Sequence, residues 1–499
     1  MKNYNYPSIS TRIAAVLLLF CFALGLAACG GGGSGGSPDT LPAASDTADS
    51  VPDAGAAETR TPLKAPVKDF GGYEYRILEY KQTETGHRQF LDFGWSSDRA
   101  GDLINDAVYQ RNSVVEERLN IEVKCVEVAN VNSNARTAIL AGSDEFDMAM
   151  DYINLALAMA QQGMLIDLYD VDIISLSEDW WDQAAIRDLA VGGRMYCATG
   201  DITMADEELN YCIFANKTVW NEYDVGDLYG IARDGKWCLD IMYNAAKDVT
   251  RDLNGDGVLD EHDVYGILTS VSVSNLWFFS AGGRAAELDA DGIPVLVLNT
   301  PKNIERIEAL HKLFNDTEVL LECTRCSNTW KTFNEMLMED RALFRAGSVY
   351  NIQQYRGMVN DFGILPYPKL DEAQENYQHL IATNNFCASV TLPVTTKDLD
   401  LNGIILEYLA YESKETITKA YYDINLYTKV SRDEDSGDMF DIIFATKLYD
   451  IGKVFNWGGL EAIINQSIGS GDFASRYSAA ESRMLSELEA SYEYFAGLE

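Results

Sequence analysis

The chain has 499 residues, of which 77 are acidic and 39 are Lys or Arg, and its formal net charge is −38 at pH 7. A surface with this much negative charge disfavours binding to nucleic acid and to anionic lipid. Hydrophobic residues make up 47% of the chain, so the composition is that of a globular protein, and the length is sufficient for two sizeable lobes.

The N-terminus has the pattern of a bacterial secretion signal. Lys2 and Arg12 supply positive charge, and the apolar stretch 13–26 is too short for a confident membrane span. The motif Leu-Ala-Ala-Cys that ends at Cys29 looks like a lipobox, in which a peptidase cleaves before the Cys and the thiol takes a lipid such as palmitate. We therefore expect residues 1–28 to be a signal peptide and the mature protein to be a lipoprotein. An ordinary signal peptide with an incidental Cys is the alternative.

A low-complexity segment follows the lipobox. Residues 30–69 are rich in Gly, Ser, Pro, Ala, Thr and Asp, a composition that cannot bury a core. We expect 29–69 to be the lipidated Cys and a flexible tether, which would hold a folded body away from a membrane.

The next part of the chain alternates between strand and helix patterns. Hydrophobic periodicity predicts strands at 73–79, 121–125 and 146–150, and helices at 103–119, 134–141 and 154–163. Such alternation predicts an α/β fold with a mostly parallel sheet that is covered on both faces. The rest of the chain also mixes the two patterns, with predicted strands at 211–215, 342–344 and 362–365, a predicted helix after Trp237, and predicted helices at 302–316, 403–412 and 475–497.

The most specific chemical motif is the twelve-residue stretch 252–263. Oxygen-bearing side chains stand at its positions 1, 3, 5, 9 and 12, and a Gly stands at position 6, which is the pattern of an EF-hand-type calcium loop. The predicted ligands are Asp252, Asn254, Asp256, Asp260 and Asp263, with the backbone carbonyl of Val258. The last position is usually Glu, and the shorter Asp would weaken the site. Because no second loop of this pattern occurs, we expect structural calcium; an acidic turn without metal is the alternative.

The cysteines do not indicate a further site. Seven remain after the signal and the lipidated Cys are set aside, and an odd number cannot all pair within the chain. Cys323 and Cys326 form a lone CxxC, which is weak for zinc or redox work without a second pair or a nearby His. Small buried apolar residues are the favoured interpretation, and the disulfide pairing stays open.

Several short motifs follow one another along residues 70–460, and their order is more informative than any one of them. They lie at 196–201, 214–217, 235–240, 363–374, 439–444 and 449–452. With the lipobox and the calcium loop, they make the chain resemble the extracellular solute-binding lipoproteins of bacterial ABC importers, of the large carbohydrate-binding, maltose-binding-protein-like type. Cys238 departs from the Thr or Ser helix cap that is usual after the Trp of the third motif.

The resemblance implies a two-lobed periplasmic-binding-protein-like fold of type II, with a ligand cleft between the lobes. Lobe one would comprise 70–208 plus 364–415, and lobe two 212–362 plus 416–499, with crossings near Tyr211 and near 363–366. Ligand binding would close the lobes by hinge motion, and the closed form would be recognised by a permease.

The function implied by the resemblance is capture of an extracellular carbohydrate, an oligosaccharide, and its delivery to ABC transporter permease subunits. The protein would be a monomer without enzymatic activity, anchored by lipid to the extracytoplasmic face of a bacterial membrane, with no nucleic-acid partner. A surface glycoside hydrolase and a non-transport carbohydrate-binding surface protein are the alternatives. The sequence contains no HExxH and no phosphate-binding glycine motif, but whether the ligand is a sugar or a peptide stays open.

Substrate-binding candidates follow from that layout, because flat aromatic rings and polar groups after strand ends suit sugars. The predicted residues are Asp151, Tyr152, Asn154, Trp277, Arg345, Ser348, Tyr350 and Trp457. Ser274 and Asn275 flank the first Trp, and Trp95 with Asp92 forms a weaker fifth place. Core packing competes evenly with sugar stacking for Trp277 and Trp457, and Arg345 is alternatively a salt-bridge partner.

Overall fold

The computed structural model describes residues 60–81, 92–384, 386–422 and 435–497. Thr61–Glu499 forms one compact unit. The predicted signal peptide and Cys29 lie outside the described residues. Within the described part of the chain, no helix combines the length and the apolar composition that a membrane crossing requires.

The folded body begins earlier than the predicted end of the tether at residue 69. Leu63 and Ala65 pack against the core, and the Tyr408 hydroxyl donates a hydrogen bond to the carbonyl of Ala65 at 3.4 Å. Composition did not indicate this docking, because two apolar side chains are sufficient to anchor an irregular segment that has no helix or strand pattern.

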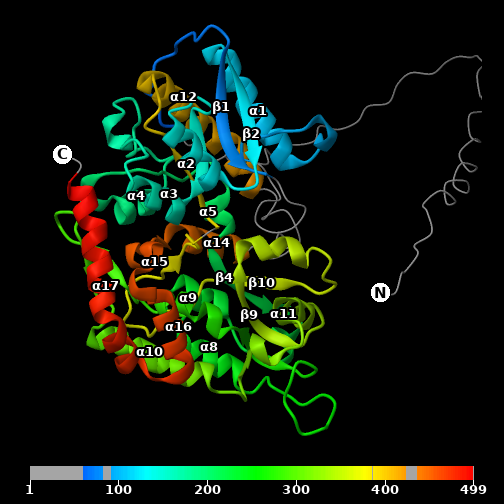
Figure 1. Ribbon diagram of the computed structural model, residues 1–499. Coiled ribbons are helices and arrows are strands. Elements are labelled where there is room, and N and C mark those ends of the chain that lie inside the picture. Colours follow the sequence, from blue (N-terminus) through cyan, green and yellow to red (C-terminus); the bar gives the residue numbers. More distant parts are fainter. Residues whose placement is uncertain (1–59, 82–91, 385, 423–434, 498–499) are drawn as a thin grey trace, which may run out of the picture. The chain divides into compact units, whose positions relative to one another are not determined.

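The first sheet has four strands in the order β12-β3-β1-β2, and β1 and β2 are labelled in Figure 1. The strand β1 is parallel to both neighbours, whereas β12 is antiparallel to β3. The strands are β1 (Tyr73–Tyr80), β2 (Ile121–Val128), β3 (Met148–Tyr152) and β12 (Ala388–Thr391). The predicted strand at 146–150 begins two residues later because the Asp147 carboxylate accepts hydrogen bonds from the backbone and side chain of Arg76 instead.

Helices connect and cover this sheet. They are α1 (Leu103–Leu119), α2 (Val131–Ala141), α3 (Ile153–Ala160) and α12 (Leu399–Ser413). Asp102 caps α1 by accepting hydrogen bonds from the amides of Ile104 and Asn105, so the predicted helix bounds are confirmed. The crossovers through α1 and α2 run in opposite directions along the sheet, and right-handed crossovers therefore place these two helices on opposite faces.

The second sheet has five strands in the order β10-β4-β9-β5-β8. They are β4 (Tyr211–Asn216), β5 (Tyr265–Thr269), β8 (Leu320–Glu322), β9 (Ala342–Ser348) and β10 (Phe362–Leu365). Here β5 is parallel to β8 and β9, while β4 is antiparallel to β9 and β10. Every residue of β5, β9 and β10 is buried, and most of them are apolar, with Arg345 on β9 as the charged exception.

Further helices follow in this part of the chain, up to the long C-terminal helix α17 (Figure 1). They are α6 (Lys217–Glu222), α7 (Leu228–Arg233), α8 (Leu239–Ala246), α9 (Ser274–Ser280), α10 (Pro301–Phe314), α11 (Thr329–Met338), α14 (Asp435–Ala445), α15 (Ile451–Phe455), α16 (Leu460–Ser470) and α17 (Phe473–Ala496). Thr300 caps α10, with a Pro at its first turn. Cys238 occupies the cap position of α8 but its side chain makes no capping hydrogen bond.

Short elements occupy the region where the chain passes between the sheets. They are α4 (Gln183–Leu189), α5 (Ala205–Glu208), the antiparallel pair β6 (Ala286–Leu288) and β7 (Pro294–Leu296), and the parallel pair β11 (His379–Leu380) and β13 (Lys447–Leu448). The chain passes from α5 directly into β4, and it returns from β10 towards β11 and β12. The predicted crossings near Tyr211 and 363–366 therefore fall at the ends of β4 and β10, while the assignment of each helix to a lobe stays a prediction.

The C-terminal helix α17 packs against both parts of the chain that flank the crossings. Near its start it contacts α16, and it also contacts the turn η9 (Trp457–Gly459). Near its end, Phe495 lies 5.6 Å from the ring of Tyr196, and α17 contacts the turn η3 (Val191–Gly193). A helix that holds segments from both predicted lobes limits how far those segments can move apart.

Candidate functional site

The carboxyl ends of the parallel strands are the first place to look for a ligand site, because the loops that leave them are free to present side chains. In the first sheet these ends are Tyr80 of β1 and Tyr152 of β3. In the second sheet they are Thr269, Glu322 and Ser348, and the start of β4 lies at the same edge because Tyr211 pairs with Ser348. Most of the predicted substrate-binding residues therefore lie at or near the carboxyl edges of the two sheets.

Asp151 organises the edge of the first sheet. Its carboxylate accepts hydrogen bonds from the Tyr80 hydroxyl at 2.9 Å and from the Asn132 side-chain amide at 2.8 Å. It is fully buried, and desolvation raises its pKa although these hydrogen bonds act in the opposite direction. Asp151 is therefore a supporting residue, which holds the Tyr80 ring in a stack with the ring of Tyr152 at 4.4 Å.

Of the predicted residues at this edge, Tyr152 and Asn154 are half-buried and remain accessible to a ligand. The Tyr152 ring lies at the strand end with Tyr80 on one face. A flat ring that is partly exposed and held in place by a neighbour is the kind of surface on which the apolar face of a sugar stacks.

At the edge of the second sheet, Asn351 holds two predicted residues. Its side-chain oxygen accepts hydrogen bonds from the backbone amide of Ser348 and from Nη1 of Arg345, each at 2.9 Å. Arg345 is 3% exposed and Tyr350 is 6% exposed, so both are much more enclosed than a loop position suggests. The alternative of a salt bridge for Arg345 is not what the structure shows, since no ion pair to this residue occurs in the described chain.

The two predicted tryptophan platforms are in the core. Trp277 is 0% exposed, donates its indole hydrogen bond to the Thr269 hydroxyl, and packs edge-on against the ring of Tyr367. Trp457 is 2% exposed, stacks on Phe455 and donates its indole hydrogen bond to Ser491 of α17. Neither ring offers a face to solvent, so the structure contradicts sugar stacking on them and assigns both to packing. Trp95, the weaker candidate, is 49% exposed.

A polar cluster that the sequence did not reveal follows the end of β5. Asn465 of α16 accepts hydrogen bonds from the backbone and side chain of Asn275, at 2.7 and 2.9 Å, and from the Ser274 hydroxyl at 3.2 Å. The sequence had indicated only Ser274 and Asn275 of this cluster. Glu461 of the same helix pairs with Lys453 and accepts a hydrogen bond from the Asn384 amide at 3.3 Å. No sequence signal would have found Glu461, Lys453 and Asn384, because they lie on unrelated elements.

Asn384 connects this cluster with the first sheet. It lies in the segment that leads into β12, and the carbonyl of Cys387 in this segment accepts a hydrogen bond from the amide of Ile153, directly after β3. Asn384 and Cys387 therefore make contacts with Glu461 of α16 and with the residue that follows β3, respectively. Burial lowers the pKa of Lys453, while the nearby Glu461 acts in the opposite direction.

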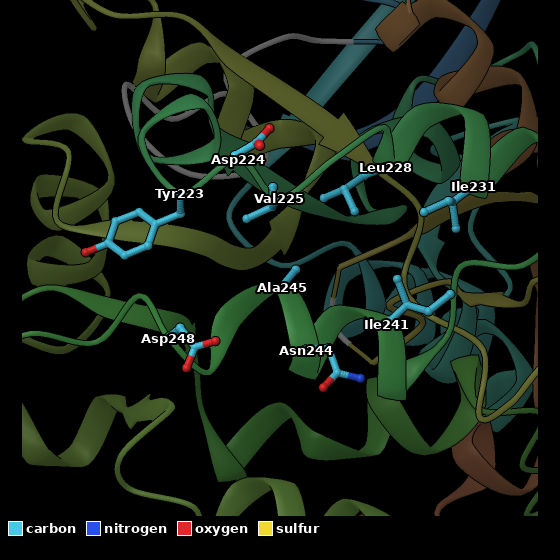
Figure 2. A pocket seen from close by; sticks show the side chains of 9 residues that line it. All are labelled: Tyr223, Asp224, Val225, Leu228, Ile231, Ile241, Asn244, Ala245 and Asp248. Carbon is cyan, nitrogen blue, oxygen red and sulfur yellow. The ribbon is translucent and has the colours of Figure 1, made fainter.

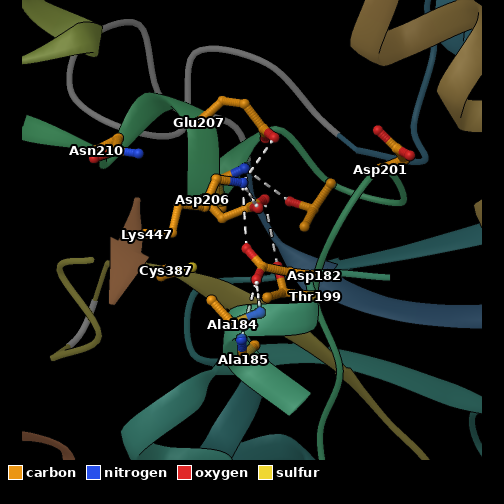
Figure 3. A network of polar contacts seen from close by, with 12 residues as sticks. Asp182, Ala184, Ala185, Thr199, Asp201, Asp206, Glu207, Asn210, Cys387 and Lys447 are labelled. Carbon is orange, nitrogen blue, oxygen red and sulfur yellow. Dashed lines mark hydrogen bonds and ion pairs between the residues drawn. The ribbon is translucent and has the colours of Figure 1, made fainter. Parts of the chain in front are cut away.

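A buried ion cluster lies where the chain enters β4 (Figure 3). The Lys447 ammonium of β13 hydrogen-bonds Asp206 and lies 3.1 Å from a carboxylate oxygen of Glu207 and 3.2 Å from one of Asp182. Burial and the neighbouring carboxylates raise the pKa of Asp206 well above its usual range, whereas the pKa of Asp182 is lowered by Lys447 and by backbone hydrogen bonds against its own desolvation. This cluster joins α4, α5 and β13, and its function is to hold the crossing.

A separate pocket of about 360 Å³ lies between α6, α7 and α8 (Figure 2). Its lining includes the apolar residues Leu228, Ile231 and Ile241 and the carboxylates of Asp224 and Asp248. The helix α6 follows the end of β4 that is opposite to Tyr211, so the pocket is away from the carboxyl edge of the second sheet. None of the predicted substrate residues lines it, and it does not carry the site.

The predicted calcium loop has the local turns of its motif. Gly257 has a φ of +79°, and the Asp252 carboxylate accepts hydrogen bonds from the amides of Gly255 and Gly257 at 2.6 and 2.9 Å. Asp263 accepts from the amides of Leu253 and Asp260, each at 2.9 Å. Within the described residues, no three or more His, Cys, Asp or Glu side chains are placed together to hold a metal ion. The donor set suits calcium, but the metal stays a prediction.

No protein-family model matches the chain, and no curated protein matches it. Solved structures do match: an extracellular solute-binding protein from Staphylococcus aureus in complex with maltose has a TM-score of 0.56 at 12% identity, covering 83% of this chain and 98% of that one.

Two further structures show the same fold. The maltose-binding protein MalE from Listeria monocytogenes, also with maltose, has a TM-score of 0.53 at 14% identity and covers 86% of this chain and 99% of its own. A cyclo/maltodextrin-binding protein with maltotetraose has a TM-score of 0.54 at 14% identity and covers 84% and 98%. The chain thus has the two-lobed α/β fold of maltose-binding-type solute-binding proteins, and the predicted fold class is confirmed.

His379 of β11 gives a prediction about the crossing. Its Nε2 accepts a hydrogen bond from the amide of Tyr367 at 3.1 Å, Nδ1 lies 2.8 Å from the Thr446 hydroxyl, and burial lowers its pKa to about 3. The fold holds this His neutral. Its contribution to the free energy of unfolding is therefore fully present above the unfolded pKa of about 6.5, and it is lost as the pH falls below that value.

We expect the free energy of unfolding of the wild type, relative to His379→Gln, to fall by about 2 kcal/mol between pH 6.5 and pH 5, at about 1.4 kcal/mol per pH unit. Urea unfolding at several pH values measures this difference. The exposed His262 serves as the matched control, and His262→Gln should retain the slope of the wild type. A slope that does not change in His379→Gln would show that this His is not held neutral.

Proposed function

We propose that this protein is the substrate-binding component of an ABC importer, and that it captures an extracellular carbohydrate between the carboxyl edges of its two sheets. The observation that carries the proposal is the fold match, which extends over 83–86% of this chain and 98–99% of three solute-binding structures with maltose-type ligands. A shared fold does not by itself assign a ligand, so the side chains at the edges supply the second argument.

Those side chains suit a polyhydroxylated ligand. Tyr152 supplies a supported aromatic ring at one edge, and Asn384, Glu461 and Lys453 supply hydrogen-bond donors and acceptors that lead to the other. Carbohydrates are bound by this combination, because a ring covers the C–H face while polar groups fix the hydroxyls. The binding residues approach from different elements, and hinge closure would bring them onto one ligand.

The carboxylates at these edges favour binding over hydrolysis. A glycoside hydrolase needs two carboxyl groups that face the scissile bond, one of them free to donate a proton. Asp151 is fully buried and accepts hydrogen bonds from Tyr80 and Asn132, and Glu461 is paired with Lys453. These two carboxylates therefore stabilise neighbours, which supports a non-catalytic binding protein.

The proposal is tested by a thermal-shift screen of the purified protein against mono- and oligosaccharides and peptides. A ligand at one hundred times its dissociation constant should stabilise the fold by about 2.7 kcal/mol, which is readable as a higher melting temperature. We expect one class of glycan to produce this shift and to be recovered intact. Recovery of cleaved glycan would establish a hydrolase instead, and a shift from peptides alone would contradict the carbohydrate ligand.

We also propose that the mature protein is anchored by lipid at Cys29 on the extracytoplasmic face of the membrane. The support is the lipobox sequence and the low-complexity segment that separates it from the folded body. Mass spectrometry of the N-terminal peptide from membranes of the expressing bacterium should find an acylated Cys29, and Cys29→Ser should release the protein from the membrane fraction. Membrane retention of that variant would contradict the anchor.

Calcium is proposed as a structural ion of the loop 252–263. Asp252 and Asp263 lie at its two ends, and both already bend the loop backbone through hydrogen bonds to its amides. Calcium would neutralise carboxylates that otherwise repel one another, and this gain would stabilise the folded state.

We expect the melting temperature of the protein to fall when a chelator removes calcium, and to recover when calcium but not magnesium is returned, since magnesium demands a tighter octahedral geometry. Asp252→Asn with Asp256→Asn should abolish the calcium dependence, while Asp234→Asn, at an exposed Asp outside the loop, should retain it. An unchanged melt in metal-free protein, confirmed by elemental analysis, would reject the structural ion.

A further inference from the structure

Arg345 is a buried arginine whose charge no carboxylate balances. It lies on β9, is 3% exposed, and makes one hydrogen bond, from Nη1 to the side-chain oxygen of Asn351. Its Nε is shielded from solvent and has no hydrogen-bond partner. No acidic residue of the described chain lies within ion-pair distance of it. An arginine carries five N–H donors, so most of the donors of Arg345 have no acceptor in the protein.

Arg111 shows how this chain satisfies another buried arginine. Arg111 is 0% exposed, and it donates hydrogen bonds to the Asn112 side chain, to the Ser413 hydroxyl and to the carbonyl of Asp92. Every nitrogen of its guanidinium has a partner. The unused donors of Arg345 are therefore not a general feature of buried arginines here, and a buried unpaired donor costs free energy unless a ligand meets it.

The guanidinium of Arg345 extends to the carboxyl edge of the second sheet. Arg345 pairs with Phe214 and lies three residues before the end of β9, and Gly347 is the next residue on the same face. A Cβ at Gly347 would lie 1.8 Å from Nη1 of Arg345, so the side chain occupies the space that a larger residue would fill. The Gly allows the charge to reach the strand end, where the ligand is proposed to bind.

Three aromatic rings surround the charge without satisfying its N–H groups. The guanidinium carbon lies 5.9 Å from the ring centroid of Phe214, 5.8 Å from that of Trp330 and 6.0 Å from that of Tyr355. The rings favour the cation electrostatically and keep water away. The planar fork of N–H donors matches the geometry of a carboxylate, sulfate or phosphate.

We infer that Arg345 binds an anionic group of the ligand, so that the substrate class is acidic oligosaccharides, which carry carboxylate or sulfate groups, rather than neutral ones. The inference rests on the proposed function, and it deepens that function by naming the substrate class. In a chain with a net charge of −38, long-range electrostatics disfavour an anionic ligand, and a dedicated cation at the site offsets that repulsion.

The test compares each acidic oligosaccharide with its own neutral form by isothermal titration calorimetry. The probes are trigalacturonate and its methyl ester, and a chondroitin sulfate tetrasaccharide and its desulfated, carboxyl-reduced form. At least one acidic probe should bind roughly 10- to 100-fold more tightly than its neutral form, because charge-assisted hydrogen bonds are lost in the latter, and added salt should weaken it. Equal affinity for the two forms, or binding of neutral probes alone, would overturn the inference.

Variants locate the effect at this residue. Arg345→Met should lose the preference for the acidic form, and Arg345→Lys should keep part of it, since Lys retains the charge without the planar fork. Arg118→Met, at an exposed arginine of α1, is the matched control and should leave the preference unchanged. If Arg345→Met does not fold, Asn351→Ala still tests the site, because it removes the group that orients the guanidinium. If Asn351→Ala and Arg345→Lys both keep the full preference of the wild type for the acidic form, the inference is overturned.

Free inorganic phosphate and sulfate form the last arm of the titration. Binding of these ions at the affinity of the acidic saccharides would show an anion site without sugar recognition and would contradict the inference. If neutral saccharides bind and acidic ones do not, the proposed function stands and only the substrate class is wrong. If no saccharide of either kind binds, both are wrong.

Discussion

The ion cluster around Lys447 is the interaction on which the arrangement of the chain depends. One buried ammonium meets carboxylates from α4 and α5, directly before the chain enters β4, and Lys447 itself lies on β13. Removal of one partner from such a cluster leaves buried charge without compensation, which costs about 3–5 kcal/mol. Burial and the neighbouring carboxylates raise the pKa of Asp206 well above its usual range, while the Lys447 ammonium acts in the opposite direction. The crossing is thus held by electrostatics that act only in this one geometry.

The directions of the strands determine where a ligand site can form, because the loops at their carboxyl ends can present side chains. Two residues just before β12 connect distant segments: Asn384 donates a hydrogen bond to Glu461, and the carbonyl of Cys387 accepts one from the amide of Ile153. Polar groups from distant parts of the chain meet there, while the tryptophans are used for packing. Arg345 differs from the other charges because the protein itself provides only one acceptor for it. A site that is incomplete in the protein alone is the physical basis for assigning a ligand to it.

The sequence predicted what depends on local patterns and missed what depends on distant partners. The helix at 103–119 was correct because Asp102 provides a cap and the apolar spacing is regular. The bounds of α10, which Thr300 caps, and of α17, which has no side-chain cap, were correct to within two residues. For Trp277 and Trp457 the sequence left sugar stacking and core packing equally open, because burial depends on which helix packs over them. In the case of Trp457 that helix is α17, which supplies Ser491.

The polar clusters could not be predicted in the same way. Lys447 is separated by 241 positions from Asp206, and the link from Asn384 to Glu461 spans 77, so no periodicity relates them. Arg345 was identified as a candidate. The sequence could not show that it lacks an acidic partner, because any arginine in a chain with 77 acidic residues has many possible partners. The predicted calcium loop 252–263 is the opposite case. Its proposed ligands lie within one short stretch of chain, so their spacing alone is enough to predict the loop.

The central claim is that one ligand lies between the carboxyl edges of the two sheets. A crystal structure of the protein with a bound saccharide tests it most directly. The account predicts an intact sugar beside the Tyr152 ring with an anionic group on the guanidinium of Arg345, and no sugar between α6, α7 and α8. A saccharide found in that pocket, or one that leaves both residues without contact, would contradict the account.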